Sequence, residues 1–140
     1  MTPVTPPVDV DRLSKLPLFG ELDHHDLSLL AAHIREVDVI EGADLMVQDE
    51  MPRELFVIET GTVGIVHDDL LIAELGAGEV VGEIGLIDPQ RRTATVRART
   101  PVRALALGFD ALAALESDMP EIVRELRAIA RRRLDELDKA

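Results

Sequence analysis

Hydrophobic and polar positions alternate along the middle of the chain, in short runs that are typical of β-strands. The alternation begins after Glu36, and its runs are Val37 to Val39, Leu45 to Val47, Leu55 to Val57, Thr62 to Val66, Leu70 to Leu75 and Val102 to Leu107. Polar or glycine-containing turns separate these runs at 41–44, 49–53, Gly61 and 67–69. Many short strands at nearly regular spacing favour a barrel or a sandwich over alternating strand–helix units.

Helical patterns precede this region. An apolar cluster around Pro17 predicts a short helix and turn; its members are Leu13, Leu16, Leu18 and Phe19. Asp23 is suited to be an N-cap, with Asp26 at the third helical position. The helix that follows is expected to carry Leu27, Leu30, Ala31 and Ile34 on one face.

Helical patterns also follow the strands. Asp110 is expected to cap a short helix that carries Leu112 and Leu115. A longer helix is predicted to start at Asp118 to Pro120, because proline is favoured in the first helical turn. Its apolar positions recur at helical spacing from Ile122 to Leu137. One face of this helix should pack on the strands or on a second copy of itself.

These elements predict a single domain of the α+β class that is mainly β. Residues 1–10 contain several prolines and are expected to be a flexible lead-in, and they lack the basic start and apolar core of a signal peptide. The domain then covers residues 11–140, with the strands at about 36–108 and the C-terminal helices at about 110–138. A chain of 140 residues can bury a substantial core.

The segment Gly82 to Val96 concentrates the chemistry of the chain. Gly85 would let the backbone approach a ligand closely, and a helical turn at this point would offer free N–H groups to an anion. Asp88-Pro89 is expected to end that turn. Arg91 and Arg92 follow, so the segment offers amides and a guanidinium for a phosphate. Glu83 adds a carboxylate for hydroxyl groups, and a ribose phosphate needs both kinds of group.

The glycines at 76, 78 and 82 suggest another interpretation, because they imitate a dinucleotide-binding glycine pattern. That motif needs a strand before it and a full helix after it. Here Arg91 and the strand-like Thr93 to Val96 arrive too soon for a full helix. We therefore assign these glycines to a turn.

The whole pattern closely resembles the cyclic nucleotide-binding domain family. Gly82-Glu-Ile-Gly-Leu86 followed by Arg92-Thr-Ala94 matches both halves of the phosphate-binding cassette of that family, and Leu55 to Ile58 with Gly61 matches a strand and turn. Two departures concern the scaffold: Asp49-Glu50 replaces a glycine common before Pro52, and Val81 replaces a frequent aromatic residue. The resemblance covers about residues 12–137. It implies an eight-stranded antiparallel β-roll, jelly-roll-like, with N-terminal helices and a C-terminal helical lid.

The resemblance also implies the site. Its ligand-binding residues would be Gly82, Glu83, Ile84, Gly85, Leu86, Arg92, Thr93 and Ala94. Glu83 would accept the ribose 2′-hydroxyl proton and Arg92 would pair with the phosphate, while Gly85, Leu86 and Thr93 would donate backbone amides. The terminal helix of the family covers the base, so Arg124, Arg127 and Arg131 are base-capping candidates. No catalytic or metal-binding residue and no cofactor besides the ligand is expected.

Charge and composition narrow the function. The formal net charge is −12, which disfavours binding to nucleic acid, and no apolar run could span a membrane. The absence of cysteine excludes disulfides and fits a cytoplasmic location. His24, His25 and His33 cluster in the sequence but lack the further ligands that a metal site would need, so they are expected to be solvated helix residues. From Arg91 to Phe109 there are five arginines and no acid; we expect Arg97, Arg99 and Arg103 to pair with acids on neighbouring strands.

Three functions can be compared. The first is a non-enzymatic sensor that binds cyclic AMP, or alternatively cyclic GMP because Thr93 follows Arg92, and then moves its terminal helix. Such a sensor needs an effector protein and can form a homodimer through that helix. The second is a degenerate fold that serves as a protein-interaction scaffold, against which the retention of Glu83 and Arg92 argues. The third is an enzyme on a cupin-like barrel. Such an enzyme would need several metal-binding histidines on its strands, and only His67 lies near a predicted strand.

Overall fold

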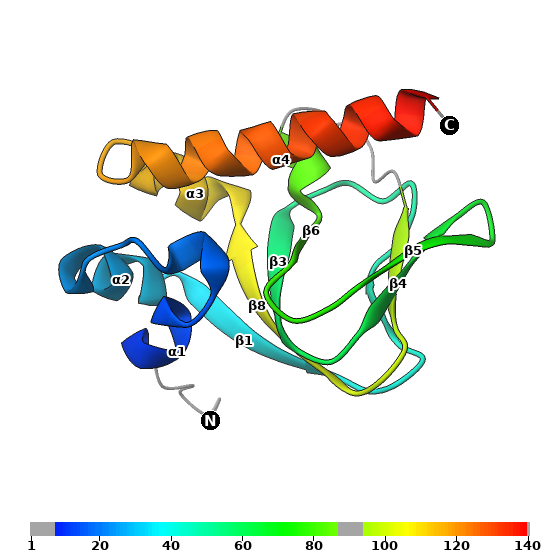
Figure 1. Ribbon diagram of the computed structural model, residues 1–140, viewed down its shortest axis with the longest axis horizontal. Helices are drawn as coiled ribbons and strands as arrows, with labels where there is room; N and C mark the ends of the chain where they lie inside the picture. The colour runs from blue at the N-terminus through cyan, green and yellow to red at the C-terminus, as the bar shows by residue number, and fades with distance from the viewer. Residues whose placement is uncertain (1–7, 87–93, 140) are drawn as a thin grey trace.

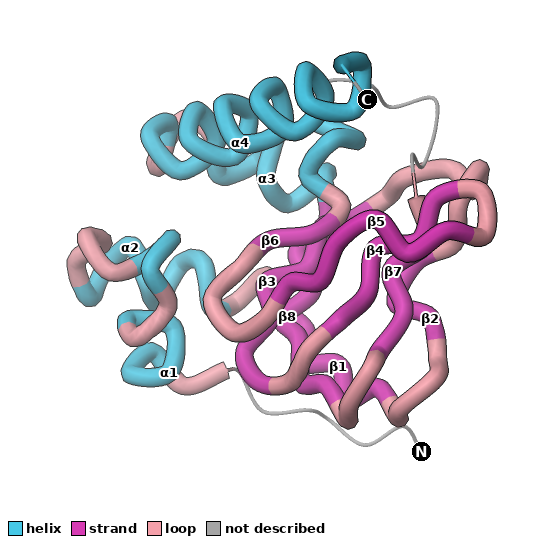
Figure 2. The backbone as a smooth tube through the Cα atoms, turned by 45° about the vertical axis from the view of Figure 1, so that its right-hand side comes forward, coloured by secondary structure: helices cyan, strands magenta, loops and turns pink. Residues whose placement is uncertain are grey.

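The computed structural model describes residues 8–86 and 94–139, the side chains of 86, 133, 134 and 136–139 excepted. Within them, eight strands form two four-stranded antiparallel sheets (Figures 1 and 2). The first sheet has the order β1-β8-β3-β6, and the second β2-β7-β4-β5. The strands are β1 Ile34–Val39, β2 Asp44–Met46, β3 Glu54–Thr60, β4 Val63–His67, β5 Leu70–Leu75, β6 Val80–Val81, β7 Thr95–Ala98 and β8 Val102–Gly108. The predicted mainly β roll is confirmed.

The helices lie against one side of this roll (Figure 1). Before the strands come α1 Val10–Ser14, the 3-10 helix η1 Pro17–Phe19 and α2 His24–Ala31. After them come α3 Phe109–Leu115 and α4 Pro120–Lys139. A second 3-10 helix, η2 Glu83–Leu86, lies between β6 and β7.

The centre of the first sheet is buried on both faces, which explains the unbroken apolar stretches Leu55 to Ile58 of β3 and Ala104 to Leu107 of β8. Leu55 and Val57 of β3 pack with the helices, whereas Phe56 and Ile58 pack inside the roll. Successive side chains of a strand point to opposite faces, so one strand serves two cores. The helical core and the roll interior therefore share a single sheet as their wall.

Asp23 caps α2 as predicted, since its Oδ1 accepts a hydrogen bond from the Asp26 backbone N at 2.8 Å. The helix ends at Ala31, however, so Ile34 is not on its face: Ile34 begins β1 and pairs with Leu107. The prediction was wrong there because an apolar residue just after a helix satisfies both periodicities.

Two further boundaries differ from the sequence prediction. Gly108, and not Asp110, is the N-cap of α3, and Asp110 lies in its first turn, where a negative charge favours the helix dipole. In the lead-in, Val8 is buried in the helical core, and the Asp9 side chain caps α1. Val8 and Asp9 thus contact the folded domain, although both lie in the segment that was expected to be flexible.

Candidate functional site

The candidate cassette begins where β6 leaves the first sheet. β6 pairs with Phe56 and Val57 of β3, and Gly82 then adopts φ +86°, a left-handed conformation that favours glycine. The reversal carries the chain directly into η2. The helical turn predicted from the sequence is therefore present, as a 3-10 turn of four residues.

Glu83, the first residue of η2, has a relative exposure of only 2%. It is the one charged residue that is buried among those whose side chains the structure describes. Burial of a carboxylate is costly, so such a residue is a candidate for a functional role. Glu83 lies at the end of the roll where η2 packs against α4, a position from which its carboxylate could make a polar contact.

From the sequence, Gly85 was expected to be needed for close approach of a ligand; the structure shows that packing within the chain also requires a glycine here. A Cβ at this position would lie 2.7 Å from the Pro52 Cβ and 2.8 Å from the Phe109 ring. The glycine is therefore required by packing inside the chain, whatever it permits toward a ligand. This contact joins the cassette to the first residue of α3.

The second half of the cassette returns to the roll at Ala94, which is 8% exposed, and Thr95, the first residue of β7. The Thr95 hydroxyl accepts a hydrogen bond from the Gln48 backbone N at 2.9 Å, which anchors this end. Ile84 is half-buried in η2. Arg92 and Thr93, like Asp88-Pro89 and Arg91, lie outside the described residues, as does the side chain of Leu86.

α4 packs chiefly against η2, so the longest helix of the molecule lies over the first half of the cassette (Figure 1). Its buried residues are Ile122, Val123, Leu126 and Ala130. Arg124, Arg127 and Arg131 are exposed and line a groove with Glu116, Pro120 and Ala128. None of the described cassette residues lines that groove, so the structure does not bring the three arginines together with Glu83, and base capping stays a prediction.

Of the three arginines expected to pair with acids on neighbouring strands, Arg97 and Arg103 do so, whereas Arg99 follows β7 and reaches past β4 to an acid on β5. Arg97 Nε lies 2.8 Å from Asp44 Oδ1, Arg99 Nε lies 3.1 Å from Glu74 Oε1, and Arg103 Nε lies 3.1 Å from Asp38 Oδ1. The hydrogen bond to Asp44 raises the pKa of Arg97, and that to Asp38 raises the pKa of Arg103. Arg97 and Arg103 each link two neighbouring strands, β7 with β2 and β8 with β1.

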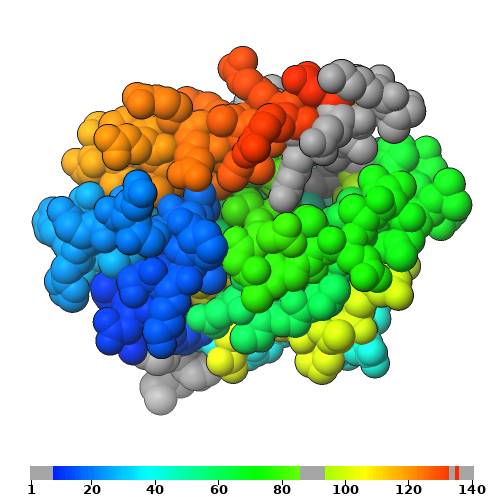
Figure 3. Space-filling view, viewed as in Figure 1, coloured from blue at the N-terminus to red at the C-terminus, as the bar shows by residue number. Residues whose placement is uncertain are grey.

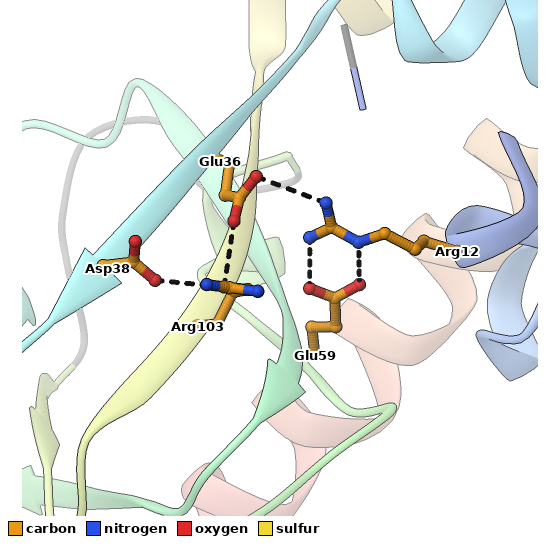
Figure 4. Close-up of polar contacts among 5 residues, drawn as sticks. All are labelled: Arg12, Glu36, Asp38, Glu59 and Arg103. Carbon is orange, nitrogen blue, oxygen red and sulfur yellow. Dashed lines mark hydrogen bonds and ion pairs between the residues drawn. The ribbon is translucent and has the colours of Figure 1, made fainter. Parts of the chain in front are cut away.

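One network was not foreseen from the sequence (Figure 4). Arg12 of α1 binds both oxygens of Glu59 on β3, with Nε 2.9 Å from Oε2, and its Nη1 lies 3.3 Å from Glu36 on β1. Glu36 also contacts Arg103 Nε at 2.9 Å. The bonds to Glu59 raise the pKa of Arg12, which stays charged at every accessible pH. The network attaches the N-terminal helices to the first sheet.

The described residues contain no group of three or more histidine, aspartate or glutamate side chains that could hold a metal ion. None of the helices, as far as the structure describes them, has the length and apolarity needed to cross a bilayer.

Comparison with known proteins gives a consistent result. A family profile described as "Cyclic nucleotide-binding domain" matches residues 36–118. The chain is 28% identical over 127 residues to a CRP-like cAMP-activated global transcriptional regulator of Mycobacterium tuberculosis, covering 87% of this chain and 57% of the regulator. It is 34% identical over 118 residues to a cyclic nucleotide-gated potassium channel of Rhizobium etli, covering 84% of this chain and 33% of the channel.

A solved structure of a cyclic nucleotide-binding domain from Methylobacillus flagellatus is also similar, with a TM-score of 0.74 and 26% identity over 93% of this chain and 79% of that one. The profile covers more than half of the chain, and it includes every strand from β2 to β8 together with the cassette. The chain belongs to the cyclic nucleotide-binding domain family, whose members are regulatory ligand-binding domains.

Proposed function

We propose that this chain is a sensor module that binds cyclic AMP at the cassette and transmits binding through α4. The observation that carries the proposal is the buried carboxylate of Glu83, at the start of η2 and beneath α4. A carboxylate held at that point suits a ribose hydroxyl, because a charged acceptor forms strong hydrogen bonds when water is excluded.

The phosphate contacts of the proposal come from both halves of the cassette. Arg92 would pair with the phosphate oxygens, and the amides of Gly85, Leu86 and Thr93 would complete the cradle. A hydrogen bond to a charged group contributes about 1.5–3 kcal/mol. A ligand of this size that gains about 0.3 kcal/mol per heavy atom would bind with micromolar affinity.

Regulation would follow from the contact between η2 and α4. A ligand can shift the position of α4 only if it binds more tightly to one position than to the other. The Gly85–Phe109 contact offers a route, because any displacement of η2 must also be accommodated at the start of α3. The two named relatives couple a nucleotide to transcription and to ion conduction respectively, which supports a regulatory role.

Ligand identity can be tested by calorimetric titration with cyclic AMP and cyclic GMP, on the wild type and on Thr93→Ala. We expect cyclic AMP to bind with micromolar affinity and more tightly than cyclic GMP. Thr93→Ala should leave cyclic AMP as the more tightly bound of the two nucleotides. Recovery of the nucleotide unchanged would agree with a module that is not an enzyme. Absence of heat with both nucleotides would favour the scaffold function instead.

Movement of α4 can be tested with spin labels, because the chain has no native cysteine. Cysteines introduced at the exposed positions Ala128 on α4 and Glu41 on the roll would report one distance. We expect saturating cyclic AMP to change that distance distribution. An identical distribution with and without ligand would refute the movement while leaving the binding proposal intact. The effector that reads this movement, and a cytoplasmic location, stay predictions.

A further inference from the structure

The two sides of α4 differ sharply in chemistry. Ile122, Leu126 and Ala130 are buried, whereas Arg124, Arg127 and Arg131 are exposed on another side at spacings of three and four residues. Residues at this spacing lie in a row on a helix surface. Together with Glu116 at the end of α3 and Pro120, the row forms an open groove of about 350 Å³.

The charge of this row contrasts with the rest of the molecule. The formal net charge of the chain is −12, yet residues 124–133 contain five arginines and a single acid, Glu125. Arginines at the same helix face repel one another slightly, by a few tenths of a kcal/mol per pair. The row therefore does not stabilise α4 by itself.

The partners of these arginines differ from those of the arginines on the roll. Arg35, Arg97, Arg99 and Arg103 each form an ion pair with an acid of their own domain. In the groove, Arg127 pairs with Glu116 at 2.9 Å. Arg124 and Arg131 form no ion pair with any side chain that the structure describes. Two guanidinium groups at the ends of the row thus remain available for carboxylates.

We propose that this groove is a docking site for an acidic segment of a partner protein, bound along α4 with its carboxylates facing Arg124 and Arg131. Guanidinium groups bind carboxylates through paired, charge-assisted hydrogen bonds. Figure 3 shows the N-terminal half of α4 (orange) running uncovered along the surface of the molecule. A partner bound there would contact the helix that packs on η2.

A narrow acidic segment fits better than a broad anionic surface. Screening limits electrostatic attraction to about 8 Å at physiological ionic strength, so a peptide would experience mainly the row. A membrane or a nucleic acid duplex would also face the acids elsewhere on a chain of net charge −12, and these repel it. The narrow width of the basic row and the negative charge of the surrounding chain therefore both favour a peptide segment over a broad anionic surface.

The test is a fluorescence anisotropy titration of the full chain at low and at physiological salt. The probe is a labelled helical peptide whose glutamates repeat at i, i+3 and i+7, and its counterpart carries lysine at the same positions. We expect the glutamate peptide to bind and the lysine peptide not to bind. The double variant Arg124→Glu/Arg131→Glu should weaken binding by at least about tenfold, and Arg124→Lys/Arg131→Lys should retain part of it.

The matched control is Lys15→Glu/Arg132→Glu, which changes the net charge equally. Lys15 ends α1, and Arg132 lines a separate cavity between α4 and η1. The control should bind the glutamate peptide within about twofold of the wild type. An equal loss in the control would overturn the proposal, because it would show that only net charge matters.

Other outcomes would also overturn the proposal. These are no binding of the glutamate peptide by the wild type at low salt, tighter binding to phosphatidylserine vesicles or duplex DNA than to the peptide, and a dimer in light scattering that Arg124→Glu/Arg131→Glu dissociates. A loss of cyclic AMP affinity in that variant with unchanged peptide affinity would instead assign the row to the base. Peptide binding is measured without nucleotide, so this test is independent of the sensor function.

Discussion

Arg12 links the N-terminal helices to the roll through ion pairs of its side chain. Its guanidinium binds Glu59 on β3 and Glu36 on β1, and these three side chains are 31%, 15% and 24% exposed respectively. Partly buried, bidentate contacts contribute more than surface ion pairs, and loss of one partner leaves a carboxylate without compensation.

We therefore predict that Arg12→Gln lowers the free energy of unfolding by about 1–2 kcal/mol. The measurement is urea denaturation followed by circular dichroism. The control is Arg35→Gln, which breaks an ion pair with Glu54 whose arginine is 63% exposed and should cost less than about 0.5 kcal/mol. Equal effects of the two substitutions would contradict a special role for Arg12.

At Gly85 the constraint is steric. An added methyl group would meet the Pro52 Cβ at 2.7 Å and the Phe109 ring at 2.8 Å, and the Pro52 ring is bonded to the backbone and cannot rotate away. We predict that Gly85→Ala lowers the free energy of unfolding by about 1–3 kcal/mol and weakens nucleotide binding.

The control for Gly85→Ala is Gly20→Ala. Gly20 has φ −64°, and a Cβ there would have its nearest neighbour at 3.7 Å, an ordinary contact. That substitution should leave stability unchanged or raise it by up to about 1 kcal/mol. Thermal melts of both variants, with and without cyclic AMP, separate the packing effect from the ligand effect. Wild-type stability in Gly85→Ala would refute the contact.

Among the elements, the β4–β5 hairpin carries the clearest backbone strain. Its two-residue turn consists of Asp68 with φ +49° and Asp69 with φ +66°, the conformations of a type I′ turn, in which glycine is preferred. Gln48 holds the turn by donating to Asp68 Oδ1 at 2.7 Å and accepting from the Asp68 N at 2.9 Å. Asp69 forms no such side-chain hydrogen bond among the described contacts.

We predict that Asp69→Gly raises the free energy of unfolding by about 1 kcal/mol, because glycine adopts positive φ without steric cost. Asp69→Ala removes the same carboxylate without relieving the strain, so it should be neutral or destabilising. Parallel urea titrations would compare them. If both variants were stabilised equally, charge and not backbone conformation would be responsible.

The sequence predicted the elements better than their contacts. Short apolar runs bounded by turn residues located β3, β4, β5 and β8, because each strand is long enough to be distinguished from its turns. β6 was not located, and only the glycines around it were assigned to a turn, since a strand of two residues has no detectable period. Ile34 was placed on a helix because its neighbours suited both structures.

For the whole molecule, the cassette could be recognised by its resemblance to the family motif, because its two halves are close together in the sequence. The contacts that connect it to the rest of the chain could not, because they join residues far apart: Gly85 with Pro52 and Phe109, and Arg12 with Glu59. The side of α4 that faces solvent was likewise undetermined, since helical periodicity identifies faces without saying what each one meets. The predicted pairing with acids on neighbouring strands is confirmed for Arg97 and Arg103, while Arg99 pairs with Glu74 one strand further away.

We propose above that a nucleotide binds at a cassette organised around Glu83. The most direct test of this proposal is a calorimetric titration of cyclic AMP into the wild type and into Glu83→Gln, which keeps the size of the side chain and removes its charge. We predict micromolar binding by the wild type and a loss of about tenfold to a hundredfold in the variant, with its fold retained in circular dichroism. Equal affinity of the two proteins would contradict the account.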